Sequence, residues 1–393
     1  MILNKKKNIC VVINNRANYA RIKSFLLLAK KNKKINLQLI MAGSSHLEKF
    51  GDITPILAKD KIKVNYKLYT VFEGNDPICM TKTTSQTISE ISTSFLNLKP
   101  DIVIVIADRY ENLAVAISAS YMNIPLAHVQ GGEVTGSIDE SVRHAITKLS
   151  HLHFVSTQRA KKFLIKMGET KENVYLTGCP SIDLINDKKL EIDKNFSQRN
   201  LGVGNTIDFS KPYLTFLMHP VTTEFIENKK YISNLIQTIN FFKKKFQIVM
   251  LWPNIDSGTD FISKNIRRFL NYNKSGIVAV YKNFSPEDYL KLLNNAKCLV
   301  GNSSSGIRES GYLGVPVVNV GNRQLDREKG PNVIDTDNNY KNIIRALSKQ
   351  LKIKKFKKSK IYGDGKAAKR ILNIILKKKI NLNKRLNYLN EKD

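Results

Sequence analysis

Short apolar runs alternate along the chain with longer segments in which apolar residues recur at helical spacing. In the first half, the apolar runs predict buried strands at Ile9–Ile13, Ile35–Met41, Ile102–Ile106, Pro125–Val129 and His153–Val155. The segments between them predict helices at Tyr19–Lys31, Thr84–Leu98, Glu111–Met122, Ile138–Leu149 and Gln158–Met167. Repeated strand, helix and strand are typical of a parallel, doubly wound α/β sheet.

The alternation weakens in a polar and charged stretch, residues 183–210, which predicts a linker with one short helix. It then restarts, with strands expected at Tyr213–Met218, Gln247–Leu251, Ile277–Tyr281, Cys298–Val300 and Val315–Val320. Helices are expected at Glu224–Lys244, Phe261–Tyr272, Pro286–Asn295 and Gly306–Leu313, and Ser285 is a suitable cap for the third of these. We therefore predict a Rossmann-like domain at 1–182, a linker at 183–210, a second Rossmann-like domain at 211–380 and a basic, polar tail at 381–393.

Two doubly wound domains joined by a linker predict a cleft between them, and ligands of such sheets bind beyond the carboxyl ends of the strands. Arg16 directly follows the first predicted strand, where a guanidinium is suited to phosphate, although it could be an ordinary exposed turn residue. Asp108 and Arg109 follow the apolar strand Ile102–Ile106, where two opposite charges form either a local ion pair or part of a site. Their position favours the site.

The run from His128 to Glu140 (HVQGGEVTGSIDE) follows the next strand. Its glycines let the backbone pass close to a ligand. Glu133, Asp139 and Glu140 place carboxylates in one loop and helix start, and Arg143 and His144 follow one turn later. A glycine-rich loop with carboxylates, an imidazole and a guanidinium suits acid–base catalysis. Alternatively, Ser137 or Asp139 only caps the helix.

Further candidates follow the strands of the second half. His219 and the loop that holds Asn254 and Asp256 could line a site or could be ordinary turns. The serine-rich loop Gly301–Glu309 precedes a helix expected to start near Ser305, so its backbone amides would form a cradle for a diphosphate. Neither a Walker A loop nor a Gly-x-Gly-x-x-Gly loop is present in the sequence, which suggests a nucleotide-sugar rather than ATP or NAD. Glu309, one turn into that helix, could accept hydrogen bonds from ribose hydroxyls.

These residues resemble the hydrolysing UDP-N-acetylglucosamine 2-epimerases of sialic-acid biosynthesis. The resemblance runs from about Asn14 to Lys369, and the long central motif and the serine-rich loop are its most specific parts. The matching motifs are NNRANY, ADRYENLAVAISA, HVQGGEVTGSIDESVRHAITKL, LTGCPSID, MHPVTTE, PNIDSG, GNSSSGIRESGYLG, GNRQ and YGDGKAAKRI. The family implies a glycosyltransferase-B-like fold, with two facing Rossmann-like domains and the nucleotide-sugar in the cleft.

The resemblance also implies roles for individual residues. Asp108 and Asp139 match acidic residues assigned to the chemistry, Glu309 matches the ribose-binding glutamate, and Asn254 and Asp256 match positions that face the nucleotide. Positions that contact UDP in the family are matched by Arg16, His219, Ser303, Ser304 and Arg323, and we add Ser305, Arg109, Arg143 and His144 as further substrate-binding candidates. The family reaction eliminates the nucleotide diphosphate to give a glycal and then hydrates it. The resemblance further implies a homo-oligomer and no cofactor.

Gln130 departs from the family, several members of which carry a glutamate at this position. An amide cannot act as a base, so either Glu133 takes over or position 130 only orients the substrate in this branch. The change could also mark a different sugar. We expect conversion of UDP-N-acetylglucosamine and water to N-acetylmannosamine and UDP, or the same reaction on a UDP- or GDP-linked 2,4-diacetamido-trideoxy sugar of the legionaminic-acid pathway. A glycosyltransferase on the same fold would need an acceptor, and the His128–Arg143 motif argues against it.

The composition narrows the remaining classes of function. The formal net charge is +31, but lysines are spread over the whole chain and the densest cluster, residues 352–360, contains a single aromatic residue, so we expect no nucleic-acid partner. The four cysteines lie far apart without Cys-x-x-Cys spacing, which argues against a metal site or a disulfide framework. No apolar run reaches the ~18 residues needed to span a bilayer. The run Ile9–Ile13, which follows the basic N-terminus, is too short for a signal-peptide core, so we expect a cytoplasmic protein without a membrane partner.

Overall fold

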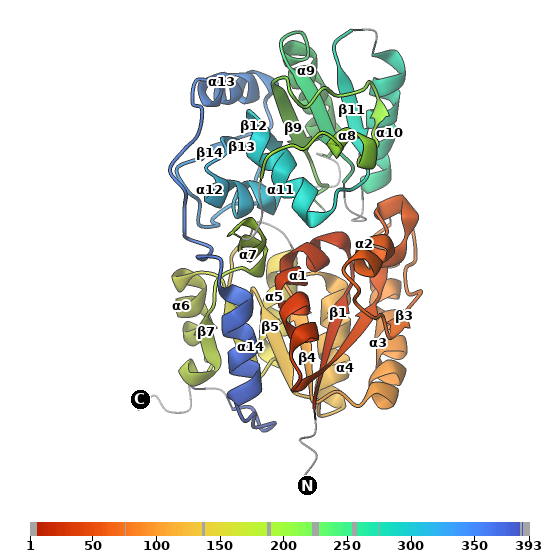
Figure 1. Cartoon of the computed structure of the whole chain (residues 1–393), viewed down its shortest axis with the longest axis vertical. Helices are drawn as coiled ribbons and strands as arrows, with labels where there is room; N and C mark the ends of the chain where they lie inside the picture. Colours follow the sequence, from red (N-terminus) through yellow and green to blue (C-terminus); the bar gives the residue numbers. More distant parts are fainter. Residues whose placement is uncertain are drawn as a thin grey trace.

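The computed structural model describes residues 6–74, 76–135, 138–186, 190–221, 228–253, 258–273, 275–385 and 387. It contains two sheets of seven strands, each covered by helices, and we call each sheet with its helices a domain (Figure 1). The first sheet has the order β3-β2-β1-β4-β5-β6-β7, and its neighbouring strands pair in parallel. Its strands are β1 Lys7–Ile13, β2 Ile35–Met41, β3 Tyr66–Lys67, β4 Ile102–Ile106, β5 Leu126–Val129, β6 Leu152–Val155 and β7 Val174–Leu176.

The helices of the first half follow these strands, as expected for a doubly wound sheet. The helices are α1 Arg16–Lys31, α2 Thr54–Lys59, α3 Pro77–Leu98, α4 Tyr110–Tyr121, α5 Asp139–Leu149, α6 Gln158–Lys166 and α7 Pro180–Asn186. Short 3₁₀ turns occur at Gly43–His46, Glu48–Phe50 and Lys171–Asn173. The central strands β1 and β4 form the core of this domain because their apolar side chains are buried on both faces of the sheet.

The second sheet has the order β14-β13-β12-β9-β10-β11-β8, and only the short β8 pairs antiparallel among its described strands. The strands are β8 Val203–Gly204, β9 Tyr213–Leu217, β10 Gln247–Leu251, β11 Val278–Tyr281, β12 Cys298–Gly301, β13 Val317–Val320 and β14 Val333–Thr336. The helices are α8 Phe196–Arg199, α9 Asn228–Phe242, α10 Thr259–Tyr272, α11 Pro286–Asn295, α12 Glu309–Leu313, α13 Tyr340–Gln350 and α14 Ala367–Lys377. The predicted α/β architecture of two doubly wound sheets is confirmed.

The polar stretch predicted to be a linker is part of the second domain. Its α8 and β8 are short, and β8 extends the second sheet at the β11 edge. Phe196, Ile207 and Phe209 are buried in the same core as β9 and β11. A few widely spaced apolar residues pack this mostly polar segment against the second domain. The sequence predicted a linker because most of the residues in the segment are polar.

The last described helix, α14, packs on the first domain although it follows the second in sequence. Its buried residues Ala368, Ile371, Leu372 and Ile375 belong to the core built on β1 and α1. Figure 1 shows α14 in dark blue beside α1, while α13 covers the second sheet at the other end of the molecule. The predicted division at residue 380 placed this helix with the second domain, whereas the chain crosses back before residue 367.

Two local expectations have different outcomes. The Ser285 hydroxyl accepts a hydrogen bond from the Asp288 backbone N–H (3.1 Å), so the predicted cap of α11 is confirmed. The helix expected from Gly306 begins only at Glu309, because a 3₁₀ turn at Ser304–Gly306 precedes it. Glu309 is therefore the first residue of α12 rather than one turn inside it. Throughout the described part of the chain, no helix is long and apolar enough to cross a membrane.

Candidate active site in the interdomain cleft

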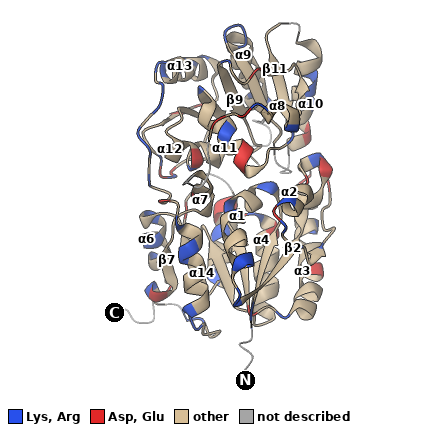
Figure 2. Ribbon diagram, viewed as in Figure 1, with Lys and Arg blue, Asp and Glu red and all other residues tan. Residues whose placement is uncertain are grey.

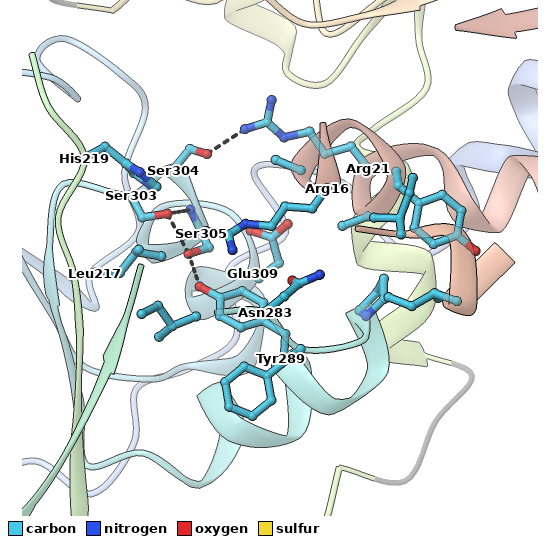
Figure 3. Close-up of a pocket in the computed structure, with 18 of the residues that line it drawn as sticks. Arg16, Arg21, Leu217, His219, Asn283, Tyr289, Ser303, Ser304, Ser305 and Glu309 are labelled. Atoms are coloured by element: carbon cyan, nitrogen blue, oxygen red, sulfur yellow. Dashed lines mark hydrogen bonds between the residues drawn. The ribbon is translucent and has the colours of Figure 1, made fainter. Parts of the chain in front are cut away.

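A pocket opens between the two domains at the carboxyl ends of the central strands (Figure 3). The first domain contributes the N-terminal turns of α1 and the apolar Ile53 and Ile56. The second contributes the end of β9, the serine-rich loop after β12 and the start of α11. The structure brings seven of the predicted binding residues into this pocket: Arg16, His219, Ser303, Ser304, Ser305, Glu309 and Arg323.

Arg16 is presented to the pocket by the start of α1. The Asn15 side chain caps this helix by accepting the Asn18 backbone N–H (2.8 Å), which places Arg16 at its first position. The guanidinium reaches the second domain and donates to the carbonyl oxygens of Trp252 (2.6 Å) and Lys282. Burial lowers the pKa of Arg16 to about 10, so it stays a cation at neutral pH. It is therefore a half-buried positive charge in the cleft.

Arg21 is a second cation of the pocket that the sequence analysis missed. Its guanidinium donates to the Ser304 hydroxyl (2.7 Å), which joins α1 to the serine-rich loop (Figure 3). The only signal in the sequence was its place in the first turns of the helix that follows the first strand. Burial, and then the neighbouring Arg308, lower the pKa of Arg21. An anion between Arg16 and Arg21 would relieve the cost of keeping these charges out of water.

The serine-rich loop is held in a defined conformation. Ser303 Oγ lies 3.0 Å from Ser305 Oγ, which is also 2.6 Å from the Tyr289 hydroxyl of α11. Gly301 has φ +141°, and a Cβ at this position would lie 1.9 Å from the carbonyl oxygen of Leu217, so only glycine lets β12 pass β9 here. Tyr289 was not found from the sequence, because its role depends on the approach of α11 to the loop.

His219 lies at the end of β9 and is fixed through Asn302. The Asn302 amide accepts the His219 backbone N–H (2.7 Å) and donates to the His219 carbonyl (2.8 Å). Burial, and then the charges of Arg323 and Arg16, hold the pKa of His219 well below its usual range, so the imidazole is neutral. Arg323 donates to the Asn302 carbonyl (3.2 Å), and its guanidinium lies 3.7 Å from Asp139 Oδ2 of the first domain.

Asp108 follows β4 and pairs with Arg143, the most buried charged side chain of α5. Burial alone would raise the pKa of Asp108, but Arg143, Arg21 and Arg327 outweigh it and hold this pKa far below its usual range. The preceding Ala107 has φ +62°, a strained value for a residue with a side chain. Its carbonyl lies 2.8 Å from His128 Nε2, so the imidazole fixes the backbone that presents Asp108.

Glu133 lies apart from the pocket, in a buried ion-pair cluster between the domains. Its carboxylate contacts Arg308 and lies 3.4 Å from Arg327, both of the second domain. Burial would raise the pKa of Glu133, but Arg308, Arg327 and Arg143 together lower it. A carboxylate with two buried arginine partners is suited to holding the domains together. Like Asp108 and Asp139, it is not among the residues that line the pocket of Figure 3.

Comparison with known proteins relates the whole chain to one enzyme family. Residues 28–376 match the family model described as UDP-N-acetylglucosamine 2-epimerase. The chain belongs to this family. It is 33% identical over 370 residues, covering 94% of this chain and 95% of its relative, to the "UDP-N,N'-diacetylbacillosamine 2-epimerase (hydrolyzing)" of Legionella pneumophila. It is 29% identical over 362 residues, covering 91% of each, to the "UDP-N-acetylglucosamine 2-epimerase" of Neisseria meningitidis serogroup B.

Solved structures of the 2-epimerase family share the fold. The UDP-GlcNAc 2-epimerase of Methanocaldococcus jannaschii, in complex with UDP-GlcNAc and UDP, superposes with a TM-score of 0.78 at 21% identity, covering 94% of this chain and 99% of that one. The Neisseria meningitidis enzyme bound to UDP-GlcNAc gives a TM-score of 0.75 at 20% identity, covering 94% and 100%. The predicted family and glycosyltransferase-B-like architecture are therefore confirmed.

Four predicted substrate-binding residues of this 2-epimerase family member lie outside the pocket of Figure 3, and one of them is Arg143, which pairs with Asp108 as described above. Arg109 forms an ion pair with Glu111 (2.9 Å), so the local pair that the sequence left open is present. His144 Nε2 lies 3.6 Å from Glu140. Gln130 is buried with φ +71°, and its amide donates to Cys179 Sγ (2.9 Å). The predicted residues Asn254, Asp256 and Ser137 lie outside the described residues.

The polar groups of the cleft fit an organic anion better than a metal. In the described ranges, no group of three or more His, Cys, Asp or Glu side chains could hold a metal ion, and the cysteines are free. The cleft instead combines arginines, serine hydroxyls and a carboxylate at the start of α12. These groups can bind the phosphates and the ribose of a nucleotide-sugar, with the Asp108 and Asp139 carboxylates toward the first domain.

Proposed function

We propose that this chain is a hydrolysing 2-epimerase that converts a UDP-linked 2-acetamido sugar and water to the free C2-inverted sugar and UDP. The observation that carries the proposal is the pocket itself. Arginines from the first domain face the serine-rich loop, His219 and Arg323 of the second domain, and Arg323 links this pocket to Asp139. The hydrolysing reaction is also that of the Legionella relative named above, which is similar to this chain over nearly its whole length.

The first half-reaction is an elimination. A carboxylate takes the proton from C2, the C2–H electrons form the C1=C2 bond, and the C1–O bond breaks so that UDP leaves with that electron pair. Arg16, Arg21 and the backbone of the Ser303–Ser305 loop stabilise the negative charge that grows on the diphosphate. Glu309 accepts hydrogen bonds from the ribose.

The second half-reaction hydrates the glycal. Water adds its oxygen to C1 and gives one proton to a carboxylate, while the C1=C2 electrons take up a proton at C2. This proton arrives on the face opposite to the one that lost it, which inverts that centre. We assign these proton transfers to Asp108 and Asp139. The ion pair with Arg143 keeps Asp108 deprotonated at neutral pH, as a base requires. Glu133, held by two arginines, serves to position the domains instead.

We infer that the sugar is a 2,4-diacetamido-trideoxy sugar. This is the substrate class of the Legionella relative and of the "GDP/UDP-N,N'-diacetylbacillosamine 2-epimerase (hydrolyzing)" of Campylobacter jejuni, which is 32% identical to this chain. Gln130 supports this choice, because it replaces the glutamate of several family members. UDP-N-acetylglucosamine is the second candidate. The Neisseria meningitidis relative, which is 29% identical, carries the name of that substrate. With this substrate, the proposed product of our chain would be N-acetylmannosamine for sialic-acid biosynthesis. The predicted homo-oligomer and cytoplasmic location stay predictions.

Incubation of the purified protein with each nucleotide-sugar in D2O, followed by NMR, tests the proposal. Free UDP with a C2-deuterated, C2-inverted diacetamido sugar is the expected result. Turnover of UDP-N-acetylglucosamine alone would transfer the assignment to the second candidate. Accumulation of an epimerised nucleotide-sugar with UDP still attached would contradict the hydrolytic step.

A further inference from the structure

The segment after α14 lies against the C-terminal end of α5. Lys384 Nζ lies within hydrogen-bond distance of the carbonyl oxygens of Thr147 (3.0 Å), Lys148 (2.9 Å) and Ser150 (2.7 Å). The Lys148 and Ser150 carbonyls belong to the last turn and the C-cap of α5, where carbonyls lack partners within the helix, and the Thr147 carbonyl also accepts the Ser150 backbone N–H (3.0 Å). A lysine ammonium at this end is also favoured by the helix dipole. Lys384 therefore caps α5 from a distant part of the chain.

A buried carboxylate completes the binding site of this ammonium. Glu169 is 1% exposed, and its Oε2 lies 2.7 Å from Lys384 Nζ and 2.9 Å from His153 Nε2. The segment is attached at two further points, where the Leu382 carbonyl lies 3.2 Å from His151 Nε2 and the Asn387 N–H donates to the carbonyl of Gly168 (3.0 Å). The Lys384 side chain is only 20% exposed. These contacts form a built anchor rather than a loose surface contact.

Both ends of α5 lead to the proposed catalytic carboxylates. Asp139 and Arg143 lie in its first half, and Arg143 pairs with Asp108. At its other end, Thr147 Oγ1 lies 3.1 Å from His128 Nδ1, and the opposite nitrogen of this imidazole contacts the carbonyl of the strained Ala107. The contact from Lys384 to the Thr147 carbonyl thus lies three links from Asp108: Thr147, His128 and Ala107.

We propose that Lys384 is a positioning residue for the epimerase reaction. It fixes the axial position of α5, and through that helix it sets Asp108 and Asp139 relative to the sugar. The inference rests on the proposed function. The family match ends at residue 376, so this anchor lies beyond the matched span. A displaced catalytic group can cost up to roughly 10²-fold in rate even when the mutation is remote from the chemistry.

The test compares Lys384→Met with Lys384→Arg and with the control Lys378→Met. Lys378 lies at the end of α14, and its ammonium contacts the carbonyl of Glu172 (3.3 Å) rather than α5. For Lys384→Met we expect kcat to fall by roughly 10- to 100-fold, while KM and the Kd for UDP stay within about twofold. The arginine variant keeps the charge and should restore part of kcat, and Lys378→Met should behave as wild type.

Hydrogen exchange of residues 139–149 supplies a readout that does not depend on turnover. In Lys384→Met these amides should exchange faster, whereas those of the serine-rich loop should not change. An unchanged kcat in Lys384→Met, or a loss of kcat with an equal loss of UDP affinity, would overturn the positioning role. If the wild-type protein turns over neither nucleotide-sugar, the proposed function fails on its own. Unchanged exchange in α5 would then reject the anchor separately.

Discussion

Asp108 is both a partner of the buried Arg143 and one of the two proposed proton-transfer residues. It is partly accessible, follows a strained alanine and pairs with a guanidinium that is almost fully buried. This environment keeps the carboxylate ionised, although burial alone would favour its neutral form. The same pairing that keeps Asp108 ionised also holds it in one orientation.

Replacing Asp108 with Asn should reduce kcat by about 10²- to 10⁴-fold, the range for loss of a general acid or base. The Kd for UDP should change little, because Asp108 is not among the residues that line the pocket. Steady-state kinetics together with calorimetric UDP titration check this. Asp101→Asn is the control at the opposite end of the same strand, where Asp101 Oδ2 accepts the Asn8 N–H (2.7 Å). Loss of UDP binding in Asp108→Asn would show that this residue is not primarily catalytic.

Replacing Glu133 with Gln should mainly destabilise the protein. The change leaves the buried Arg308 and Arg327 without their carboxylate, and breaking such a buried pair costs about 3–5 kcal/mol of the free energy of unfolding. Because the folded-state pKa of Glu133 is lowered, its stabilisation is present above the unfolded pKa of about 4.3 and is lost as pH falls through the lowered folded-state pKa. The loss of unfolding free energy in Glu133→Gln, relative to wild type, should therefore be largest at pH 7 and should shrink as pH falls below about 4.

Urea unfolding of Glu133→Gln at pH 7 and at acid pH measures this difference. The control is Glu48→Gln, because Glu48 is 93% exposed and its loss should change stability by less than about 0.5 kcal/mol. A variant that keeps wild-type stability at pH 7 but no longer exchanges the C2 proton would identify Glu133 as a base after all.

At the scale of the element, the central strands could be predicted because each is an apolar run buried on both faces. The strand β14 and the helices α13 and α14 were not predicted. The strand β14 is short, and the two helices flank a lysine-rich stretch, residues 352–360, that resembles a solvated tail. The domain to which α14 belongs depends on where the chain crosses back. Local pattern carries no information about that.

The residues of the site that directly follow strands could be predicted from the sequence, whereas the others could not. Arg16, His219 and the serine-rich loop directly follow strands, and the parallel topology brings such positions together. Arg21, Tyr289 and the arginine partners of Glu133 lie inside helices or later loops. Their roles arise from contacts between distant segments, which the sequence pattern does not contain.

Replacing Ile371 of α14 with Ala should destabilise the first domain by about 2–5 kcal/mol, because this side chain is fully buried against its core. Asn373→Ala on the exposed face of the same helix is the control and should change stability by less than about 0.5 kcal/mol.

Since the helix ties the end of the chain to the first sheet, thermal unfolding of the wild type should remain one cooperative transition. Two separate transitions in the wild type would show that α14 does not couple the domains.

At the scale of the whole molecule, the first turns of α1 hold the two domains around the pocket. Arg16 contacts the Trp252 carbonyl, Arg21 contacts Ser304, and the buried Lys23 lies 2.8 Å from Glu287 of α11. Each of these side chains crosses from the first domain to the second. A single helix therefore both supplies the pocket with positive charge and joins the surfaces that form it.

The positive charge is not confined to the pocket, because the whole chain has a formal net charge of +31. Lysines and arginines occur over both domains rather than in one stripe (Figure 2). A doubly charged nucleotide-sugar would be attracted from a distance comparable with the Debye length, which is about 10 Å at 0.1 M salt and shorter at higher salt. The attraction acts on encounter and binding, whereas the proposed chemical step involves partly buried groups within the protein, which salt screens less.

We therefore expect kcat/KM to fall several-fold as NaCl is raised from about 0.02 to 0.5 M, mostly through a rise in KM, with kcat nearly constant. Initial rates over this range measure the effect, and potassium glutamate at equal ionic strength controls for specific chloride binding. A variant in which several lysines of residues 352–360 are changed to Gln should show a smaller dependence if distant surface charge contributes. If kcat/KM of this variant falls with salt as steeply as that of the wild type, the salt dependence arises from Arg16, Arg21 and Arg323 within the cleft. A KM that does not respond to salt at all would mean that the positive charge of this chain has no part in capturing its substrate.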